Sequence, residues 1–153
     1  DESTIAASEA FAAFLSHRHE VSLFANAESV LTHLHQHYQI GALTNGNADV
    51  RKTKIGEHFD FAWRAEEFGV SKPNPTFFHA AFAQVGVTPE EVIHVGDCHD
   101  NDVDGAVEAG AKAIWLKPEG GLSDIASEVI PQLSDLPTAI GRVLGSRGPS
   151  AQH

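Results

Sequence analysis

The chain has 153 residues, of which 42% are hydrophobic and 20% charged, and its formal net charge is −11. This composition predicts one ordinary domain with a buried core and argues against disorder. The negative charge would repel a nucleic-acid backbone, so we predict no nucleic-acid partner, although a small phosphate ester needs only a local positive pocket. No stretch is long and apolar enough to predict a membrane span, and the single Cys98 cannot form an internal disulfide. We therefore predict a cytoplasmic protein without a membrane partner.

The first part of the chain predicts helices and short strands. Apolar residues at i, i+3 and i+4 predict a helix over residues 4–18. A second helix is predicted after Asn26, whose side chain can cap it. The apolar run Ile40–Thr44 predicts a strand that ends in a turn, followed by a helix near Ala48–Ile55 and a strand over Phe59–Trp63. The apolar positions of the first two helices are Phe11, Phe14, Leu15, Val30, Leu31, Leu34 and Tyr38.

The second part of the chain has clear helix-boundary signals. Asn74 can cap a helix that begins at Pro75 and ends at Gly86. Thr88-Pro89-Glu90-Glu91 is a capping-box pattern just before the apolar strand Val92–Val95. The remaining predicted elements are a helix that buries Val103, Ala106 and Val107 and ends at Gly110, strands at Ala113–Leu116 and Glu128–Ile130, a helix near Pro137–Leu144, and a tail over Gly145–His153 that frays.

Strands that alternate with helices predict a parallel sheet with right-handed crossovers, which is a doubly wound, Rossmann-like α/β fold. Folds of this kind bind ligands beyond the carboxyl ends of their strands. The polar residues that follow the predicted strands are therefore the first candidates for a functional site.

A metal site is predicted after the strand Val92–Val95. Gly96 allows a sharp turn, Asp97 follows it, and Asp102 opens the next helix. Oxygen-only carboxylate clusters suit Mg²⁺, which phosphate chemistry uses. We predict Asp97 and Asp102 as the metal-binding acids, with Asp102 either holding a metal-bound water or orienting Lys72.

Two further positions at the same predicted edge of the sheet suit a phosphate. The Thr44 hydroxyl and the backbone N–H groups of Asn45 and Gly46 can donate hydrogen bonds to phosphate oxygens. Lys72 supplies a positive charge that offsets charge built up during phosphoryl transfer. Taken singly, each of these residues also suits a plain structural role: a turn residue, a surface lysine, or the helix caps Asp97 and Asp102.

In their order and spacing, the motifs resemble the haloacid dehalogenase (HAD) superfamily, most of whose members are phosphatases. Leu43-Thr44-Asn45-Gly46 resembles its second motif, Ser71-Lys72-Pro73-Asn74-Pro75 its third, and Gly96-Asp97 with Asp102 its fourth. The Leu-Thr-Asn-Gly-Asn form further resembles bacterial phosphatases that act on flavin mononucleotide or ribityl phosphates. The resemblance implies a Mg²⁺-dependent phosphatase that acts on a small phosphorylated metabolite through an aspartyl phosphate.

The chain departs from this family at its first motif. That motif, Asp-x-Asp-x-Thr after the first strand, supplies the nucleophile and the general acid/base, and it does not occur here. We therefore expect residues 1–20 to be a remnant of the family's helical cap, 21–145 the core without its first, central strand, and 146–153 a flexible tail. An empty central position would expose the edges of two apolar strands. We thus expect either a fragment or another segment or chain that completes the sheet.

Three interpretations of the function stay open. The first is the phosphatase, inactive as this chain alone, and the second is a non-catalytic HAD-like module that binds a phosphorylated ligand or a protein partner. The third is dehalogenation, which is disfavoured because the resemblance ties the Asp97–Asp102 pair to Mg²⁺ and dehalogenases need no metal. Substrate identity and oligomeric state are not predicted.

Other candidate residues favour plain roles. His33 and His37 could share a helix face and bind zinc with His35 nearby, but no third ligand is apparent, so a solvated face is favoured. Cys98 is a poor Mg²⁺ ligand and is expected to fill space in its loop. His94 lies inside an apolar strand and is expected to be a satisfied core residue. Asp100 and Asn101 could cap the helix or touch metal-bound water.

Overall fold

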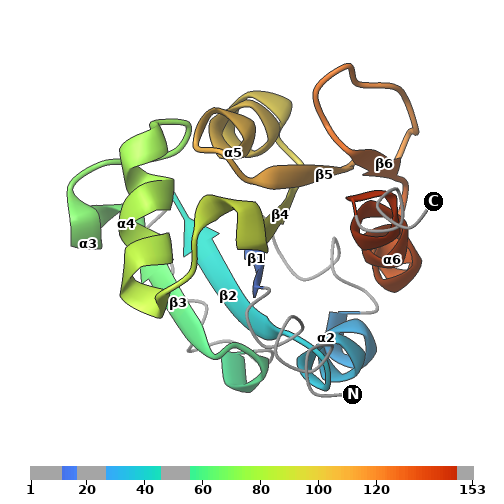
Figure 1. The fold of residues 1–153 in the computed structure, drawn as a ribbon, viewed down its shortest axis with the longest axis horizontal. Helices are drawn as coiled ribbons and strands as arrows, with labels where there is room; N and C mark the ends of the chain where they lie inside the picture. The colour runs from blue at the N-terminus through green and yellow to red at the C-terminus, as the bar shows by residue number, and fades with distance from the viewer. Residues whose placement is uncertain (1–11, 17–26, 46–55, 148–153) are drawn as a thin grey trace.

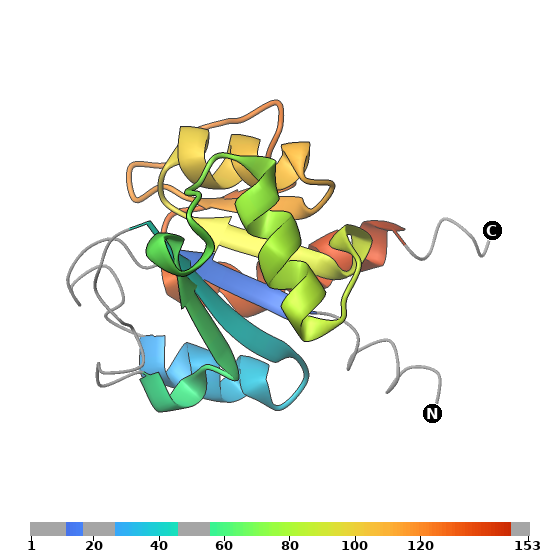
Figure 2. The same ribbon diagram turned by 90° about the vertical axis from the view of Figure 1, so that its left-hand side faces the viewer.

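The computed structural model describes residues 12–16, 27–45 and 56–147 and shows one parallel sheet covered by helices on both faces (Figures 1 and 2). The six strands lie in the order β3-β2-β1-β4-β5-β6, and every neighbouring pair is parallel. This arrangement confirms the predicted doubly wound α/β fold. The strands are β1 (Ala12–Ser16), β2 (Gln39–Thr44), β3 (Phe61–Arg64), β4 (Val92–Gly96), β5 (Lys112–Leu116) and β6 (Glu128–Ile130).

Two buried clusters hold the helices on the sheet. One face is covered by α2 and α6, where Leu31 and Ile140 pack against strand residues such as Ile93. The other face is covered by α4 and α5, where Phe78 and Ala106 pack over the opposite side chains of the same strands. The helices are α2 (Ala27–His35), α3 (Ala65–Phe68), α4 (Pro75–Val85), α5 (Gly105–Glu108) and α6 (Leu136–Arg147). Short 3-10 turns are η3 (Gly56–His58), η4 (Pro89–Glu91) and η6 (Leu133–Asp135), and η5 (His99–Asp104) is a π-helical segment.

The central position of the sheet is occupied by the chain itself. β1 pairs with β2 on one side, where Ala12 is in register with Gln39, and with β4 on the other, where Ala12 is in register with Val92. The predicted helix over residues 4–18 is therefore wrong for residues 12–16, and the sheet does not lack its central strand. The strand that fills this position comes from the range expected to be a remnant of a helical cap, so that expectation is also wrong for residues 12–16. A short apolar run suits a helix face and a buried strand equally well, and the pairing on both sides decides between them.

Most of the other predicted elements are present with small shifts in their bounds. The Asn74 side chain caps α4 by accepting a hydrogen bond from the Thr76 N–H at 2.9 Å, and Gly86 ends that helix at φ +80°. Val107 is 38% exposed, so its predicted burial is wrong. α6 continues to Arg147, past the predicted start of the tail. The predicted helix near residues 48–55 lies outside the described residues.

Within the described residues, no helix combines the length and apolar character that crossing a membrane requires.

Candidate active site

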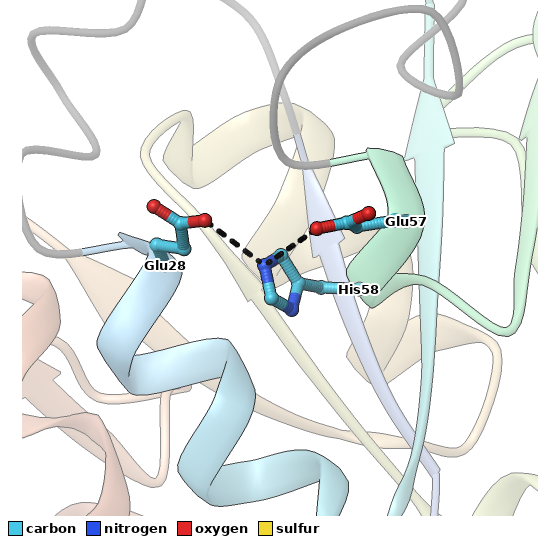
Figure 3. A group of neighbouring side chains, drawn as sticks. All are labelled: Glu28, Glu57 and His58. Atoms are coloured by element: carbon cyan, nitrogen blue, oxygen red, sulfur yellow. Dashed lines mark ion pairs between the residues drawn. The ribbon is translucent and has the colours of Figure 1, made fainter.

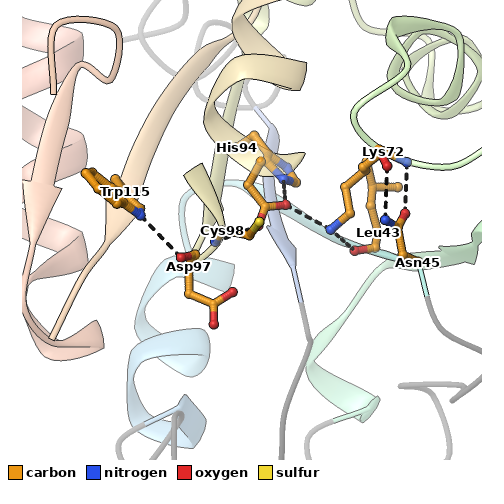
Figure 4. Close-up of polar contacts among 8 residues, drawn as sticks. Leu43, Asn45, Lys72, His94, Asp97, Cys98 and Trp115 are labelled. Carbon is orange, nitrogen blue, oxygen red and sulfur yellow. Dashed lines mark hydrogen bonds and ion pairs between the residues drawn. The ribbon is translucent and has the colours of Figure 1, made fainter. Parts of the chain in front are cut away.

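A buried ion pair lies at the carboxyl end of the central strands (Figure 4). The Lys72 Nζ atom is 2.8 Å from Asp102 Oδ1 and donates a second hydrogen bond to the Leu43 carbonyl at 3.2 Å. The two charged side chains are 3% and 1% exposed. Lys72 comes from the loop before α4 and Asp102 from η5, so the fold brings together two motifs that the sequence keeps well apart.

The Asp102 carboxylate accepts three hydrogen bonds. Oδ1 accepts from Lys72 Nζ and from the His94 ring at 3.0 Å, and Oδ2 accepts from the Cys98 N–H at 3.2 Å. Burial alone would raise the pKa of the Asp102 carboxyl, but the His94 hydrogen bond and the Lys72 charge outweigh it and hold that pKa well below its ordinary value. Asp102 is therefore ionised and carries the negative charge that faces Lys72.

Asn45 fixes the backbone of Lys72. Its side-chain oxygen accepts from the Lys72 N–H at 2.8 Å, and its side-chain nitrogen donates to the Lys72 carbonyl at 3.1 Å. The neighbouring Thr44 is only 4% exposed at the end of β2. The structure thus places Asn45 against Lys72, with Thr44 one residue earlier on β2, and the roles of these residues toward phosphate stay predictions. The predicted phosphate donor Gly46 lies outside the described residues.

Gly96 is required by the close approach of Asp102. A Cβ atom at Gly96 would overlap the Asp102 carboxylate. The sequence singled out Gly96 for the turn after β4, and the structure adds a steric reason: only a residue without a side chain leaves Asp102 its place beside Lys72.

Asp97 differs from Asp102 because one of its carboxylate oxygens has no hydrogen-bond partner among the described residues. Its Oδ1 atom is buried, and no described residue gives it a hydrogen bond. Its backbone carbonyl accepts from the Trp115 indole N–H at 3.2 Å, which holds the start of the turn in place (Figure 4). A buried carboxylate oxygen without a partner is a good fit for a cation, whereas both Asp102 oxygens are already engaged. Of the two roles predicted for Asp102, its contacts match the orientation of Lys72; metal coordination by either acid stays a prediction.

Two site residues were not predicted from the sequence as parts of the site. His94 is buried as expected, but its ring bonds the carboxylate that holds Lys72. A single polar residue in an otherwise apolar strand is the signal that could have found it. Trp115 holds the Asp97 carbonyl across two neighbouring strands, and no local pattern signals that contact.

The described residues form two other groups of metal-type ligands. Glu28, Glu57 and His58 meet where α2 approaches η3 (Figure 3), and His99 meets Asp100 and Asp104 in η5. Glu28 and Glu57 are 72% and 76% exposed and lie 3.6 Å and 4.0 Å from the His58 Nε2 atom, so the first group is a contact between surface side chains and does not call for a metal.

His33 and His37 are exposed, as expected, but α2 ends at His35, so His37 lies in the following turn and the two do not share a helix face. Their ring centroids are 5.5 Å apart, but neither belongs to a group of three metal-type ligands in the described part of the chain.

Known proteins are similar to this chain along most of its length. The chain is 31% identical over 135 residues to "5-amino-6-(5-phospho-D-ribitylamino)uracil phosphatase YigB" of Escherichia coli, covering 87% of this chain and 57% of that protein. It is 34% identical over 127 residues to "Phosphoserine phosphatase" of Thermus thermophilus, covering 79% and 50%. The crystal structure of 2-haloacid dehalogenase from Pseudomonas syringae superposes with a TM-score of 0.74 at 36% identity, covering 78% of this chain and 54% of that one.

This chain spans about half the length of these relatives. The family described as haloacid dehalogenase-like hydrolase matches residues 1–110, a range that holds the Lys72–Asp102 pair and the strands that carry it. On this match, the chain belongs to the haloacid dehalogenase-like hydrolase family.

Proposed function

We propose that this chain forms the phosphate- and magnesium-binding part of a phosphomonoester hydrolase. The observation that carries the proposal is the buried Lys72 ammonium, held between the Leu43 carbonyl and the Asp102 carboxylate at the carboxyl end of the central strands. An ammonium fixed in this way needs no reorganisation when negative charge builds up on a phosphoryl oxygen. The Asn45 side chain supports this role because it fixes the backbone from which Lys72 extends.

Magnesium fits the donor set at Asp97. Its buried Oδ1 atom has no hydrogen-bond partner among the described residues, so it is available to a cation. When bound, Mg²⁺ would offset the charge of a phosphate group and of its leaving oxygen. The Trp115 indole N–H keeps the Asp97 backbone in one position, and the Cys98 N–H keeps Asp102 turned toward Lys72.

The proposed substrate class is a small phosphate monoester in the cytoplasm. Two relatives are named as phosphatases, one of a phosphoribityl compound and one of phosphoserine. Ribityl phosphates are the first substrates to test, since the Leu43–Asn47 sequence also resembles phosphatases of that group.

Hydrolysis also needs a nucleophile. In the family, an aspartate after the first strand attacks phosphorus and forms an aspartyl phosphate, and a second aspartate serves as acid and base. In this chain β1 ends at Ser16, and residues 12–26 contain no aspartate. We therefore propose that the chain alone binds ligands without turnover and that an aspartate pair elsewhere in the complete gene product completes the site.

Binding measurements on the chain test the two halves of this proposal separately. Calorimetric titration with Mg²⁺ should show binding that Asp97→Asn abolishes and that Asp124→Asn, an exposed loop acid, leaves unchanged. Titration with inorganic phosphate in excess Mg²⁺ should show binding that Lys72→Met weakens markedly. Lys112→Met is the control, because Lys112 starts β5 at the opposite end of the sheet. If both site variants bind as the wild type does, the assignment of the site is wrong.

Turnover measurements on the complete gene product then test the reaction. We expect Mg²⁺-dependent release of phosphate from an aryl phosphate, lost in Asp97→Asn and Lys72→Met. Phosphate binding without hydrolysis would favour the non-catalytic module, for which the absent aspartate in residues 12–26 is the supporting observation. Halide release from a 2-haloacid without added metal would favour a dehalogenase instead, the activity named for one structural relative.

A further inference from the structure

His94 is a fully buried titratable residue that the proposed reaction does not yet use. It lies in the middle of β4, is 0% exposed, and its Nε2 atom is 3.0 Å from Asp102 Oδ1. That oxygen also accepts the hydrogen bond from Lys72 Nζ at 2.8 Å. One carboxylate oxygen thus joins a lysine that faces the site to a histidine inside the core.

The ring is fixed on its other sides as well. The buried Phe78 ring of α4 meets the imidazole edge-on, with ring centroids 5.1 Å apart and planes at 89°. Among the described residues, none bonds the His94 Nδ1 atom. Such a ring can serve Asp102 only as a neutral donor through Nε2–H, and burial agrees with this because it lowers the pKa of the His94 imidazole.

A neutral donor has a specific effect on the ion pair. A second cation beside Asp102 would compete with Lys72 for the same negative charge. The imidazole instead contributes a hydrogen bond that fixes the rotamer of the carboxylate and leaves its charge to the ammonium. The Cys98 N–H restrains Asp102 Oδ2 at 3.2 Å. His94 therefore supplies the restraint on Asp102 Oδ1, the oxygen that also binds Lys72.

We propose that His94 is a positioning residue, which orients the Lys72 ammonium toward a bound phosphate by fixing the shared oxygen of Asp102. The role of Lys72 toward phosphate rests on the function proposed above, but the effect of His94 on Lys72 does not. The proposal predicts that every consequence of losing the His94 donor passes through Lys72.

The test compares variants that remove or keep the donor. His94→Leu removes it at similar bulk, His94→Gln keeps an N–H donor, and His33→Leu on the exposed face of α2 is the control. The first readout is the rate at which formaldehyde and a reductant methylate Lys72 in the folded chain, followed by proteolysis and mass spectrometry of the peptide that contains Lys72. The rate should rise about ten-fold in His94→Leu, because a hydrogen bond to a charged group restrains the pair. It should return toward the wild-type rate in His94→Gln and stay unchanged in His33→Leu.

The second readout is a double-variant comparison of inorganic phosphate affinity in excess Mg²⁺. His94→Leu should weaken binding about ten-fold, whereas His94→Leu combined with Lys72→Met should bind no more weakly than Lys72→Met alone. Additive losses, or a methylation rate that His94→Leu does not change, would overturn the proposal.

If the wild type binds no phosphate, the proposed function fails, and the methylation rates still decide the role of His94. If His94→Leu does not fold, His94→Gln alone decides the question. The proposal is supported if Lys72 is methylated in His94→Gln as slowly as in the wild type, and it is refuted if Lys72 is methylated ten-fold faster.

Discussion

Replacing Lys72 by methionine is expected to lower the free energy of unfolding substantially. The ammonium lies 2.8 Å from Asp102 Oδ1, and the two side chains are 3% and 1% exposed. The substitution keeps most of the apolar stem but leaves a buried carboxylate with only two N–H donors, from His94 and Cys98. Breaking a buried ion pair on one side costs about 3–5 kcal/mol. For a domain of this size, that loss lowers Tm by roughly 6–20 °C.

Urea unfolding followed by circular dichroism at pH 7 measures this loss. Two companion variants separate the buried charge from other effects. Combining Lys72→Met with Asp102→Asn removes the uncompensated charge while an amide oxygen still accepts from His94, so the double variant should be more stable than Lys72→Met. Arg142→Met breaks an exposed ion pair with Glu128 and should cost much less. If Lys72→Met costs no more than Arg142→Met, the buried pair is not what stabilises this edge of the sheet.

Three further predictions follow from single contacts. Gly96→Ala places a Cβ atom against the Asp102 carboxylate and should lower the free energy of unfolding, measured in urea, by about 1–3 kcal/mol. Gly145→Ala has open space around it and should not destabilise the fold, so equal effects of the two variants would contradict the steric argument. Asn74→Ala removes the cap of α4 and should cost about 1 kcal/mol, most of which Asn74→Ser should restore; a loss of similar size in both variants would refute the capping role. Because burial lowers the pKa of His94 in the folded state, the unfolded chain binds this proton first as the pH falls below the ordinary value of 6.5. The free energy of unfolding should therefore decrease below that pH, by at most about 1.4 kcal/mol per pH unit for this group. If the free energy of unfolding of His94→Gln falls with pH as steeply as that of the wild type, this assignment is contradicted.

The sequence predicts those parts of the fold whose signals are local. The bounds of α4 follow from Asn74, Pro75 and Gly86, which act on neighbouring backbone groups, and the apolar runs at β2 and β4 are strong enough to stand alone. Residues 12–16 could not be assigned in this way. Their conformation is decided by pairing with β2 and β4, which lie far along the chain.

The same distinction applies to the site. Lys72 and Asp102 are predicted because the family resemblance ties their motifs to one function, and the structure confirms that they meet. The contribution of His94 depends on the side-chain direction within β4 and on a carboxylate from the following turn. Only the folded sheet brings those two groups to one point. A prediction that treats β4 as a uniformly apolar core strand therefore misses the contact between His94 and Asp102.

The position of β1 between β2 and β4 has a consequence for the folding kinetics. Ala12 pairs with Gln39 on one side and Val92 on the other, so the centre of the sheet depends on contacts with a high contact order. Parallel pairs also require long crossovers, whose closure costs entropy before the pairing repays it. Such topologies fold slowly. Since Thr44 ends one flanking strand and Asp97 follows the other, the edge that carries the candidate site acquires its register only when the last long-range pairing forms.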